Sequence, residues 1–407
     1  MAEELAYILI TPYSIRKSRT GGIIARLLSR SGLELVAGRM FAPSRELIEE
    51  YARSIVTEAD PRHRRTQELI RDYVLKNMAP NAEGKRRRTL MLVLRGENAV
   101  ARVLEVAGHI EHERTAGETI RDTYGDYLTD GERVLYFEPA VLAAPNRETA
   151  EADLKLWARY SDSDGGLLEK IVPYPEGANV QNTLVLIKPD NFRFPNVRPG
   201  AVIDTFSKTG LSIIGFKVHH MSVAEAEQFY GPVLDVLKDV LRAPTARRAR
   251  FAIEEELGCP IGDKAETAIG NLLGPIAAQA HWESIIQFMS GGRPSQCTPE
   301  QKAAPGTEKC VAIIYQGIDA VKKIREVLGP TDPSKAPLGT IRREFGQTMM
   351  VNAAHASDSP ENAQREMGII RAHENNLKSL IETHFASAAA ASPGTSAIAV
   401  ESQTNHR

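Results

Sequence analysis

The chain contains two copies of one sequence pattern, separated by well over a hundred residues. The first copy opens with Ala-Tyr-Ile-Leu-Ile-Thr-Pro at residues 6–12, and the second with Thr-Leu-Val-Leu-Ile-Lys-Pro at residues 183–189. Later, Glu-Thr-Ile-Arg at residues 118–121 is matched by Gly-Thr-Ile-Arg at residues 339–342. This period is too long for a solenoid repeat. The sequence therefore predicts a duplicated domain.

Each copy alternates predicted strands with predicted helices. Residues 7–10 and 90–94 are apolar and typical of strands, while residues 99–107 are typical of a helix. The pattern fits the βαββαβ ferredoxin-like arrangement, in which helices cover an antiparallel sheet. The predicted fold class is therefore α+β, with two ferredoxin-like domains. The elements expected in the first copy are 7–10, 22–29, 34–37, 45–54, 90–94 and 99–107, and those in the second are 184–187, 200–208, 211–218, 222–239, 311–315 and 318–328.

Composition and pattern suggest where the domains begin and end. The first copy spans residues 1–160, and a stretch rich in Asp, Gly and Pro at residues 161–181 reads as a linker. The second copy spans residues 182–375 and carries an insertion of about fifty residues, roughly 232–280, which is partly helical in pattern. The Ala-rich segment at residues 386–407 has no amphipathic pattern and is predicted to be disordered.

Bulk properties exclude several classes of partner. A net charge of −2 gives no electrostatic argument for nucleic-acid binding. The acidic opening has no signal-peptide pattern, and no apolar stretch reaches the roughly 20 residues that a membrane span needs. The three cysteines, Cys259, Cys297 and Cys310, form no CxxC motif, which argues against disulfides and zinc. We therefore expect a cytoplasmic protein with no membrane or nucleic-acid partner.

A lone histidine lies close to a fixed cation in the second copy. His355 follows Arg342 by thirteen residues, inside Asn-Ala-Ala-His-Ala-Ser-Asp-Ser at residues 352–359. A guanidinium binds phosphate oxygens in a planar, bidentate way, and a neutral imidazole can act as a nucleophile. The pair therefore indicates phosphoryl transfer through a phosphohistidine. A core histidine beside an ordinary turn is the commoner role for a histidine considered alone.

The surrounding motifs resemble those of nucleoside diphosphate kinase. The strand at residues 184–187 runs into Lys188-Pro-Asp, the loop Leu-Gly-Pro-Thr-Asp-Pro spans residues 328–333, and residues 352–359 match Asn-x-x-His-x-Ser-Asp-Ser. These motifs are in the correct order over residues 183–370. The resemblance implies the ferredoxin-like fold and a ping-pong transfer of the γ-phosphate between nucleoside tri- and diphosphates. It also implies ATP or another nucleoside triphosphate as a substrate, and Mg²⁺.

The same resemblance assigns roles to residues around the phosphates. His355 would be the nucleophile, and Glu366, eleven residues later, would orient its ring. Lys188, Arg325 and Arg342 would surround the phosphates, because fixed cations supply most of the catalysis in phosphoryl transfer.

Further residues would bind the rest of the substrate. Thr331 would donate a hydroxyl to the phosphates, and Asn352 an amide to the sugar or bridging oxygens. Tyr230 would lie near the histidine, and Ser357 would bond the backbone or Glu366. Asp358 would hold a water bound to Mg²⁺.

Two side chains would enclose the base. Met349 would form one wall, and either His281 or Trp282 the other, just after the insertion; the family places a phenylalanine there. An imidazole or an indole can stack on a base. Base specificity should therefore be loose.

The first copy has lost the family's chemistry. Thr11 replaces the lysine, and residues 141–146 contain no histidine. Arg102, Arg121 and Tyr51 remain as apparent counterparts. We expect a structural or assembly domain that packs on the second copy as a pseudo-dimer, with residual nucleotide binding as the alternative. The whole chain is expected to form a homo-oligomer.

Two other functions stay open at this level. The insertion could reshape the base slot and leave a nucleotide-binding regulator without turnover. Alternatively, the phosphohistidine could pass its phosphate to a protein partner. The cationic run at residues 85–88 is interpreted as a solvated loop before a strand.

Overall fold

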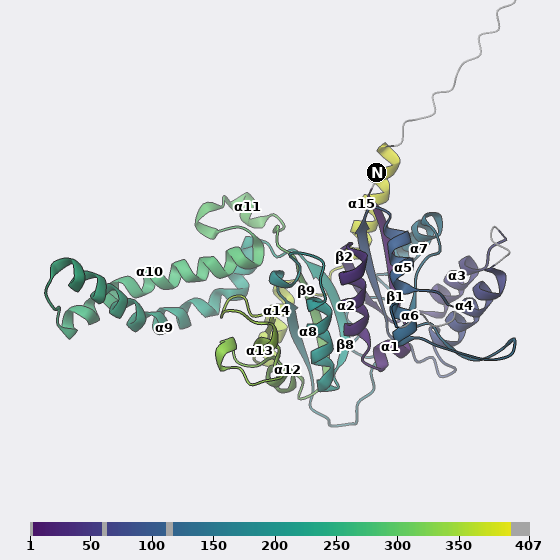
Figure 1. Ribbon diagram of the computed structural model, residues 1–407, viewed down its shortest axis with the longest axis horizontal. Helices are drawn as coiled ribbons and strands as arrows, with labels where there is room; N and C mark the ends of the chain where they lie inside the picture. The colour runs from purple at the N-terminus through teal and green to yellow at the C-terminus, as the bar shows by residue number, and fades with distance from the viewer. Residues whose placement is uncertain (1–2, 59–62, 111–116, 392–407) are drawn as a thin grey trace, which may run out of the picture.

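The computed structural model describes residues 3–58, 63–110 and 117–391, and it contains one antiparallel four-stranded sheet in each copy. The strand order is β2-β3-β1-β6 in the first copy and β10-β7-β9-β8 in the second. Helices cover the sheets, so the prediction of two ferredoxin-like α+β domains is confirmed (Figure 1). In the first copy the sheet consists of β1 (Glu4–Ile10), β2 (Glu34–Phe41), β3 (Thr89–Gly96) and β6 (Val141–Leu142), with a separate hairpin of β4 (Asp126–Asp130) and β5 (Arg133–Glu138). Its helices are α1 (Pro12–Arg16), α2 (Thr20–Ser31), α3 (Arg45–Ile55), α4 (Arg64–Asn77), α5 (Ala99–Ala107), α6 (Ile120–Tyr124) and α7 (Arg147–Tyr160).

The second copy repeats this plan and adds longer helices. Its central strands β7 and β9 are apolar and buried, which gives the sheet a continuous core. The strands are β7 (Val180–Ile187), β8 (Ser212–His219), β9 (Cys310–Ile318) and β10 (Ala354–Ala356). The helices are α8 (Arg198–Phe206), α9 (Val223–Leu257), α10 (Asp263–Ser290), α11 (Pro299–Ala303), α12 (Ala320–Leu328), α13 (Ile341–Phe345), α14 (Pro360–Ile369) and α15 (Asn376–Ala391).

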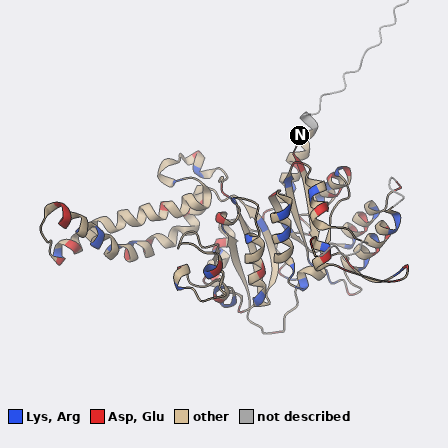
Figure 2. Cartoon of the chain, in the orientation of Figure 1, with Lys and Arg blue, Asp and Glu red and all other residues tan. Residues whose placement is uncertain are grey.

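The insertion forms the outer part of a long helical hairpin. Helices α9 and α10 pack along each other and project away from both sheets (Figure 1). The shaft of the hairpin carries few charges, which gather near its tip (Figure 2). Val236, Val240, Leu272 and Ile276 of the shaft are more than half exposed. Within the described residues, no helix is both long enough and apolar enough to cross a membrane.

The end of the chain differs from the prediction of a disordered tail. Residues 386–391 belong to α15, and residues 392–407 lie outside the described part. Helix α15 crosses back to the first copy, where it contacts α7 and β2. Lys155 of α7 lies over the ring of Phe385 at 5.0 Å. These contacts with the other copy, which a local pattern does not reveal, hold the helix up to Phe385 against the first copy.

Besides the contacts of α15, the two copies meet mainly through one helix and one edge strand from each. Helix α2 packs against α8, and β2 lies beside β8 (Figure 1). Glycines allow the helices to approach closely: a Cβ on Gly200 would lie 2.1 Å from the backbone nitrogen of Ala25, and one on Gly21 would lie 2.2 Å from that of Asp204. A side chain at either position therefore forces the two copies apart.

Gly200→Ala is expected to destabilise the protein by about 1–3 kcal/mol, because the added methyl overpacks a contact between two backbones. The matched control is Gly368→Ala in α14, where nothing lies within 4 Å of the added Cβ. That variant should be neutral or more stable by up to about 1 kcal/mol, because alanine favours helix more than glycine does. Thermal and denaturant unfolding measure both changes. Equal stability of the two variants would contradict the close packing of α2 on α8.

Candidate active site

A short edge strand holds His355 in the second copy. Strand β10 pairs antiparallel with β7, so that His355 lies opposite Leu186. Ala353, two residues before it, has a positive φ of 69°, an uncommon backbone conformation for a residue other than glycine. The imidazole is half-buried, and the rings of Phe229 and Tyr230 meet it edge-on at centroid distances of 5.0 and 6.2 Å. The ring is therefore enclosed by aromatic side chains from the base of α9.

A carboxylate fixes the orientation of this imidazole. Nε2 of His355 lies 2.9 Å from Oε2 of Glu366, a buried residue of α14. The hydroxyl of Ser357 donates to the same oxygen at 2.6 Å. Because a carboxylate accepts, Nε2 is the protonated nitrogen of neutral His355, and Nδ1 carries the lone pair. Within the described part of the chain, no hydrogen bond reaches Nδ1.

Lys188 lies at the end of β7, almost fully buried. Its Nζ donates to Oδ1 of Asn352 at 2.8 Å and to the carbonyl oxygen of Met350 at 3.1 Å. It also lies 5.7 Å from the ring centroid of Phe288 on α10. Burial, and then the nearby charge of Arg342, lower the pKa of Lys188 to about 7. The neutral amine is thus poised to gain a proton when an anion arrives.

Arg342 braces the strand that carries the histidine. Its Nη1 donates to the carbonyl oxygen of Gly329 at 3.0 Å, and its Nη2 to that of Ala354 at 3.2 Å. Burial, followed by the charge of Arg325, lowers the pKa of Arg342 to about 10. Arg342 and Arg325 are therefore close enough to repel each other, which favours an anion between or beside them.

The amide of Asn352 has a different task from the one expected. Its Nδ2 donates to the carbonyl oxygens of Thr331 and Met349, at 3.1 and 2.8 Å, while its Oδ1 accepts from Lys188. Both amide hydrogens are thus committed to protein groups instead of facing a sugar or a bridging oxygen. The residue holds Lys188 and the two flanking loops in place.

The base-binding residues are only partly brought together. Met349 is exposed in the loop before β10. On α10, His281 is exposed and has no hydrogen bond to a described residue, whereas the adjacent Trp282 is buried and donates from Nε1 to the carbonyl oxygen of Tyr230 at 2.8 Å. Consecutive helix residues point about 100° apart. Trp282 therefore packs its ring against α9, and His281 on the exposed side of α10 stays the predicted second wall for the base.

Of the remaining predicted residues, three are exposed and Tyr230 is buried. Thr331 is exposed in the loop after α12. Arg325 of α12 and Asp358 together line an open hollow of about 500 Å³. The hydroxyl of Tyr230 is buried without a hydrogen-bond partner among the described residues, and burial raises its pKa. Tyr230 thus packs against His355 instead of acting as an acid or base.

The fit of Mg²⁺ depends on the substrate. Among the described residues, no group of three or more His, Cys, Asp or Glu side chains could hold a metal. Asp358 is an exposed carboxylate whose Oδ1 accepts from Nδ2 of Asn362 at 2.6 Å. Mg²⁺ commonly binds through one or two carboxylates together with substrate phosphates and waters. The site fits Mg²⁺ that arrives with a nucleotide.

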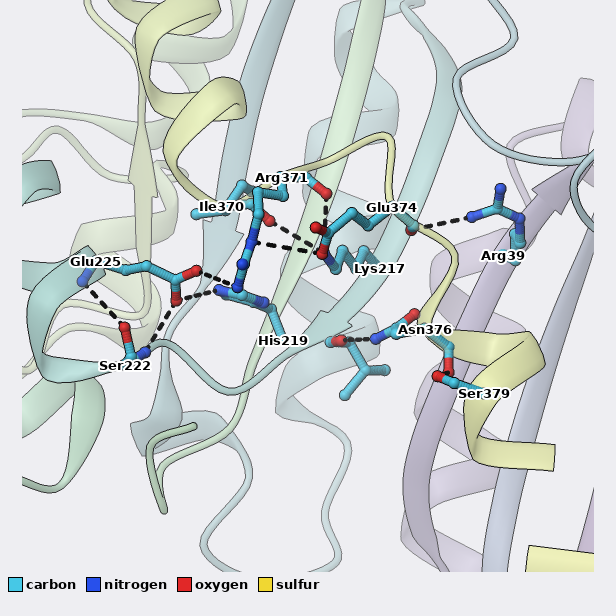
Figure 3. Close-up of polar contacts among 11 residues, drawn as sticks. Arg39, Lys217, His219, Ser222, Glu225, Ile370, Arg371, Glu374, Asn376 and Ser379 are labelled. Atoms are coloured by element: carbon cyan, nitrogen blue, oxygen red, sulfur yellow. Dashed lines mark hydrogen bonds and ion pairs between the residues drawn. The ribbon is translucent and has the colours of Figure 1, made fainter. Parts of the chain in front are cut away.

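A polar network that the sequence did not reveal connects the two elements flanking His355. At the start of α9, Glu225 accepts from Nε2 of His219 at 3.1 Å and from Nη2 of Arg371 at 2.8 Å (Figure 3). Burial alone would raise the pKa of Glu225, but His219, the backbone of Ser222 and Arg371 together lower it to about 2. Arg371 follows α14, which carries Glu366. The network therefore joins the helix behind the aromatic rings to the helix that orients the imidazole.

The network also reaches the first copy. Buried Lys217 donates to the carbonyl oxygens of Ile370 and Arg371 at 3.0 and 2.9 Å. From the first copy, Nη1 of Arg39 donates to the carbonyl oxygen of Glu374 at 3.2 Å (Figure 3). These residues are far apart in sequence and carry no motif, so no local signal could have identified them.

The first copy keeps the scaffold of the site without its chemistry. Leu142 lies opposite Leu9 in the register that places His355 opposite Leu186. Arg121 donates to the carbonyl oxygens of Gly108 and Val141, as Arg342 does to those of Gly329 and Ala354.

The helix that follows β3 changes one predicted correspondence. Helix α5 ends at Gly108, whose N–H bonds the carbonyl oxygen of Leu104, and α12 ends at Gly329, whose N–H bonds that of Arg325. Leu104, not Arg102, is therefore the counterpart of Arg325, and the first copy has lost this cation as well.

Known proteins match this chain in parts of both copies. A sequence model described as nucleoside diphosphate kinase matches residues 4–161 and 277–375. The nucleoside diphosphate kinase of Sulfurisphaera tokodaii is 28% identical over 207 residues, which cover 51% of this chain and 99% of that protein. That of Helicobacter pylori strain Shi470 is 30% identical over 187 residues, covering 46% of this chain and 92% of that protein. A crystal structure of the Aquifex aeolicus nucleoside diphosphate kinase is 25% identical, covers 49% of this chain and 98% of that chain, and has a TM-score of 0.29.

Proposed function

Because the chain belongs to the nucleoside diphosphate kinase family, we propose that it transfers the γ-phosphate of a nucleoside triphosphate to a nucleoside diphosphate through phospho-His355. The observation that carries this proposal is the bond from Nε2 to Glu366, which leaves Nδ1 with a free lone pair. Nδ1 attacks the γ-phosphorus, the bond to the bridging oxygen breaks, and a nucleoside diphosphate leaves. An oxygen of the second diphosphate then attacks the phosphohistidine, and Nδ1 recovers its electron pair.

Glu366 supports both half-reactions. Its carboxylate stabilises the positive charge that the ring acquires when Nδ1 is phosphorylated. The hydrogen bond from Ser357 keeps Oε2 in position at both stages. The protein therefore keeps one ring orientation throughout the cycle, so that neither half-reaction requires the imidazole to rotate.

The cations stabilise charge on the phosphates. Lys188, Arg342 and Arg325 would face the oxygens of the transferring group, whose charge spreads during transfer. When bound, Mg²⁺ neutralises charge on the β- and γ-phosphates, and a water held by Asp358 would complete its ligands.

Labelling with γ-labelled ATP tests this function directly. We expect an acid-labile, alkali-stable label on the protein, which a nucleoside diphosphate discharges as a labelled triphosphate. A coupled assay with a different diphosphate measures turnover under the same conditions. A label that diphosphates do not discharge would contradict the proposal and favour a protein as the acceptor. Nucleotide binding without label or turnover would also contradict it and favour a nucleotide-binding regulatory protein.

Nucleotide binding should be linked to the protonation of Lys188. At pH 8 the free protein has this amine mostly neutral, because its pKa is about 7, whereas bound phosphate favours the ammonium form. Binding of ADP should therefore take up close to one proton at pH 8 and much less at pH 6. Calorimetry in buffers of different ionisation enthalpy measures this uptake.

The control for this experiment is Lys188→Met, which keeps the length of the side chain and removes its charge. Proton uptake at pH 8 should disappear in that variant. If uptake persists there, another group titrates and the role given to Lys188 is wrong.

We also propose that the protein works in a reducing cytoplasm as an assembly built on the pseudo-dimer of its two copies. All three cysteines are free, with Cys310 buried, so the fold needs no oxidising compartment. The packing of α2 on α8 and of β2 beside β8 supports the pseudo-dimer.

A further inference from the structure

A large cavity lies at the junction of the two copies, away from the site of His355. Its volume is about 950 Å³, within the range of small-molecule sites. The first copy contributes α1, α4, β5 and residues 81–88, the linker contributes residues 171–173, and the second copy contributes residues 210–212 at the start of β8. It is not the first copy's remnant of the catalytic site, because Tyr51, Arg121 and Leu142 do not line it.

The lining of this cavity carries far more positive than negative charge. Its two carboxylates are already occupied: Asp72 pairs with Arg71 at 2.8 Å, and Glu138 accepts from Thr11 and Tyr73 at 2.8 and 2.7 Å. Of the cations, Arg86 is paired with Asp164 outside the cavity lining. The others have no ion pair with a described residue. The six cations that line the cavity are Arg16, Lys76, Lys85, Arg86, Arg87 and Arg88.

Among these cations, Arg88 gives the strongest argument for a bound anion. Its Nη1 donates to the carbonyl oxygen of Ile213, at 2.6 Å, across the boundary between the copies. Burial lowers the pKa of Arg88, and no described carboxylate lies within ion-pair distance to compensate. The guanidinium is partly buried and has no counter-charge, so an anion in the cavity would offset the cost of its lost hydration.

The chemistry of the walls narrows the class of anion. Arg87 and Arg88 each have one Nη donor engaged with backbone carbonyl oxygens, so their other guanidinium N–H groups are left for a ligand. Planar guanidiniums bind phosphate in a bidentate way, and lysines add point charges. Several unpaired cations in one cavity are not balanced by a single charge. A ligand with several negative charges, on groups that guanidinium recognises, therefore fits this lining best.

We propose that this cavity binds a small anion with two or more phosphate groups, at a site separate from His355. Arg87 and Arg88 bind it from the β3 side, and Lys76 and Lys85 close over it from α4 and the loop. The run of cations at residues 85–88, interpreted from the sequence as a solvated loop, is then a binding element. Because Arg88 also bonds Ile213 of β8, occupancy stabilises the junction of the copies.

Protection of lysines from acetylation tests this site on the full chain, with sodium tripolyphosphate as the probe. The reaction rates of Lys76 and Lys85, followed by mass spectrometry of their peptides, should fall about tenfold at saturation, because a bound ammonium is shielded from the reagent. Lys264, exposed on the hairpin, is the internal control and should react at an unchanged rate. Sodium chloride at equal ionic strength separates binding from screening.

Two variants make the result specific. Arg88→Gln keeps an amide donor for Ile213 and removes the charge, so the tripolyphosphate concentration for half-protection should rise about tenfold. Lys85→Gln should weaken protection of Lys76 without touching the junction. The proposal is overturned if Lys76 and Lys85 react equally fast with and without tripolyphosphate. It is also overturned if the protection of Lys76 is the same in both variants as in the parent protein.

Discussion

His355→Ala is expected to abolish phospho-enzyme formation and nucleotide exchange together while the protein stays folded. Alanine removes Nδ1, the atom that would carry the phosphate, and no other described group occupies that place. The expected loss of turnover is about 10⁴-fold or more, as for other enzymes that lose their covalent nucleophile. Glu366 keeps its bond from Ser357, so the buried carboxylate does not lose every partner. Labelling by ATP and steady-state exchange measure the two losses.

Two controls separate loss of the nucleophile from loss of structure. The unfolding temperature of His355→Ala should stay close to that of the parent, and ADP should still bind. His406→Ala, which removes a histidine from the segment after α15, should label and turn over as the parent does. Normal exchange by His355→Ala would end the phosphohistidine mechanism, whatever the labelling shows.

The parts of the site that the sequence could predict are those fixed by local geometry. The ten residues between His355 and Glu366 include the turn from β10 into α14, and this short connection places the carboxylate next to the imidazole. The duplicated fold was predictable for a similar reason. The strand and helix patterns of each copy are local, and each agrees with the same fold.

The parts that the sequence could not predict depend on contacts between distant segments. The insertion hid the register of α10, so His281 could not be told from Trp282, and the proximity of Phe288 to Lys188 was missed. For Asn352, the sequence shows that an amide is present but does not show which carbonyl oxygens accept its hydrogen bonds. Residue type suggests Arg102 as the counterpart of Arg325, whereas the helix end at Gly108 sets the register and places Leu104 there.

The duplication also separates scaffold from chemistry. Asp153 in the first copy accepts from Tyr7 and Ser54, and burial raises its pKa to about 6 even though these hydrogen bonds lower it. It follows Leu142 by the eleven residues that separate Glu366 from His355. An acid at this position is therefore retained where there is no imidazole to orient. Retention in the first copy thus identifies features that the fold itself needs.

Lys188→Ala and Arg342→Ala are each expected to lower turnover by about 10²–10³-fold, because each removes a preorganised charge from the phosphates. The two differ in their effect on stability. Arg342 holds two backbone carbonyl oxygens, so its loss should also cost about 2–5 kcal/mol. Lys188→Ala should lower the free energy of unfolding by less, because burial of this charged side chain is itself unfavourable, as its lowered pKa shows.

Arg121→Ala supplies the matched control for Arg342. It removes the same pair of backbone bonds, to Gly108 and Val141, from the copy without a nucleophile. Its stability should fall about as far as that of Arg342→Ala, while turnover per folded molecule stays near that of the parent. Denaturant unfolding and steady-state kinetics on the folded fraction, below the temperature at which either variant melts, distinguish the two effects. If both arginine variants lose stability and keep turnover, Arg342 is scaffold alone, and Lys188 and Arg325 must supply the charge. If Arg121→Ala loses turnover as strongly as Arg342→Ala, the first copy takes part in the chemistry of the second.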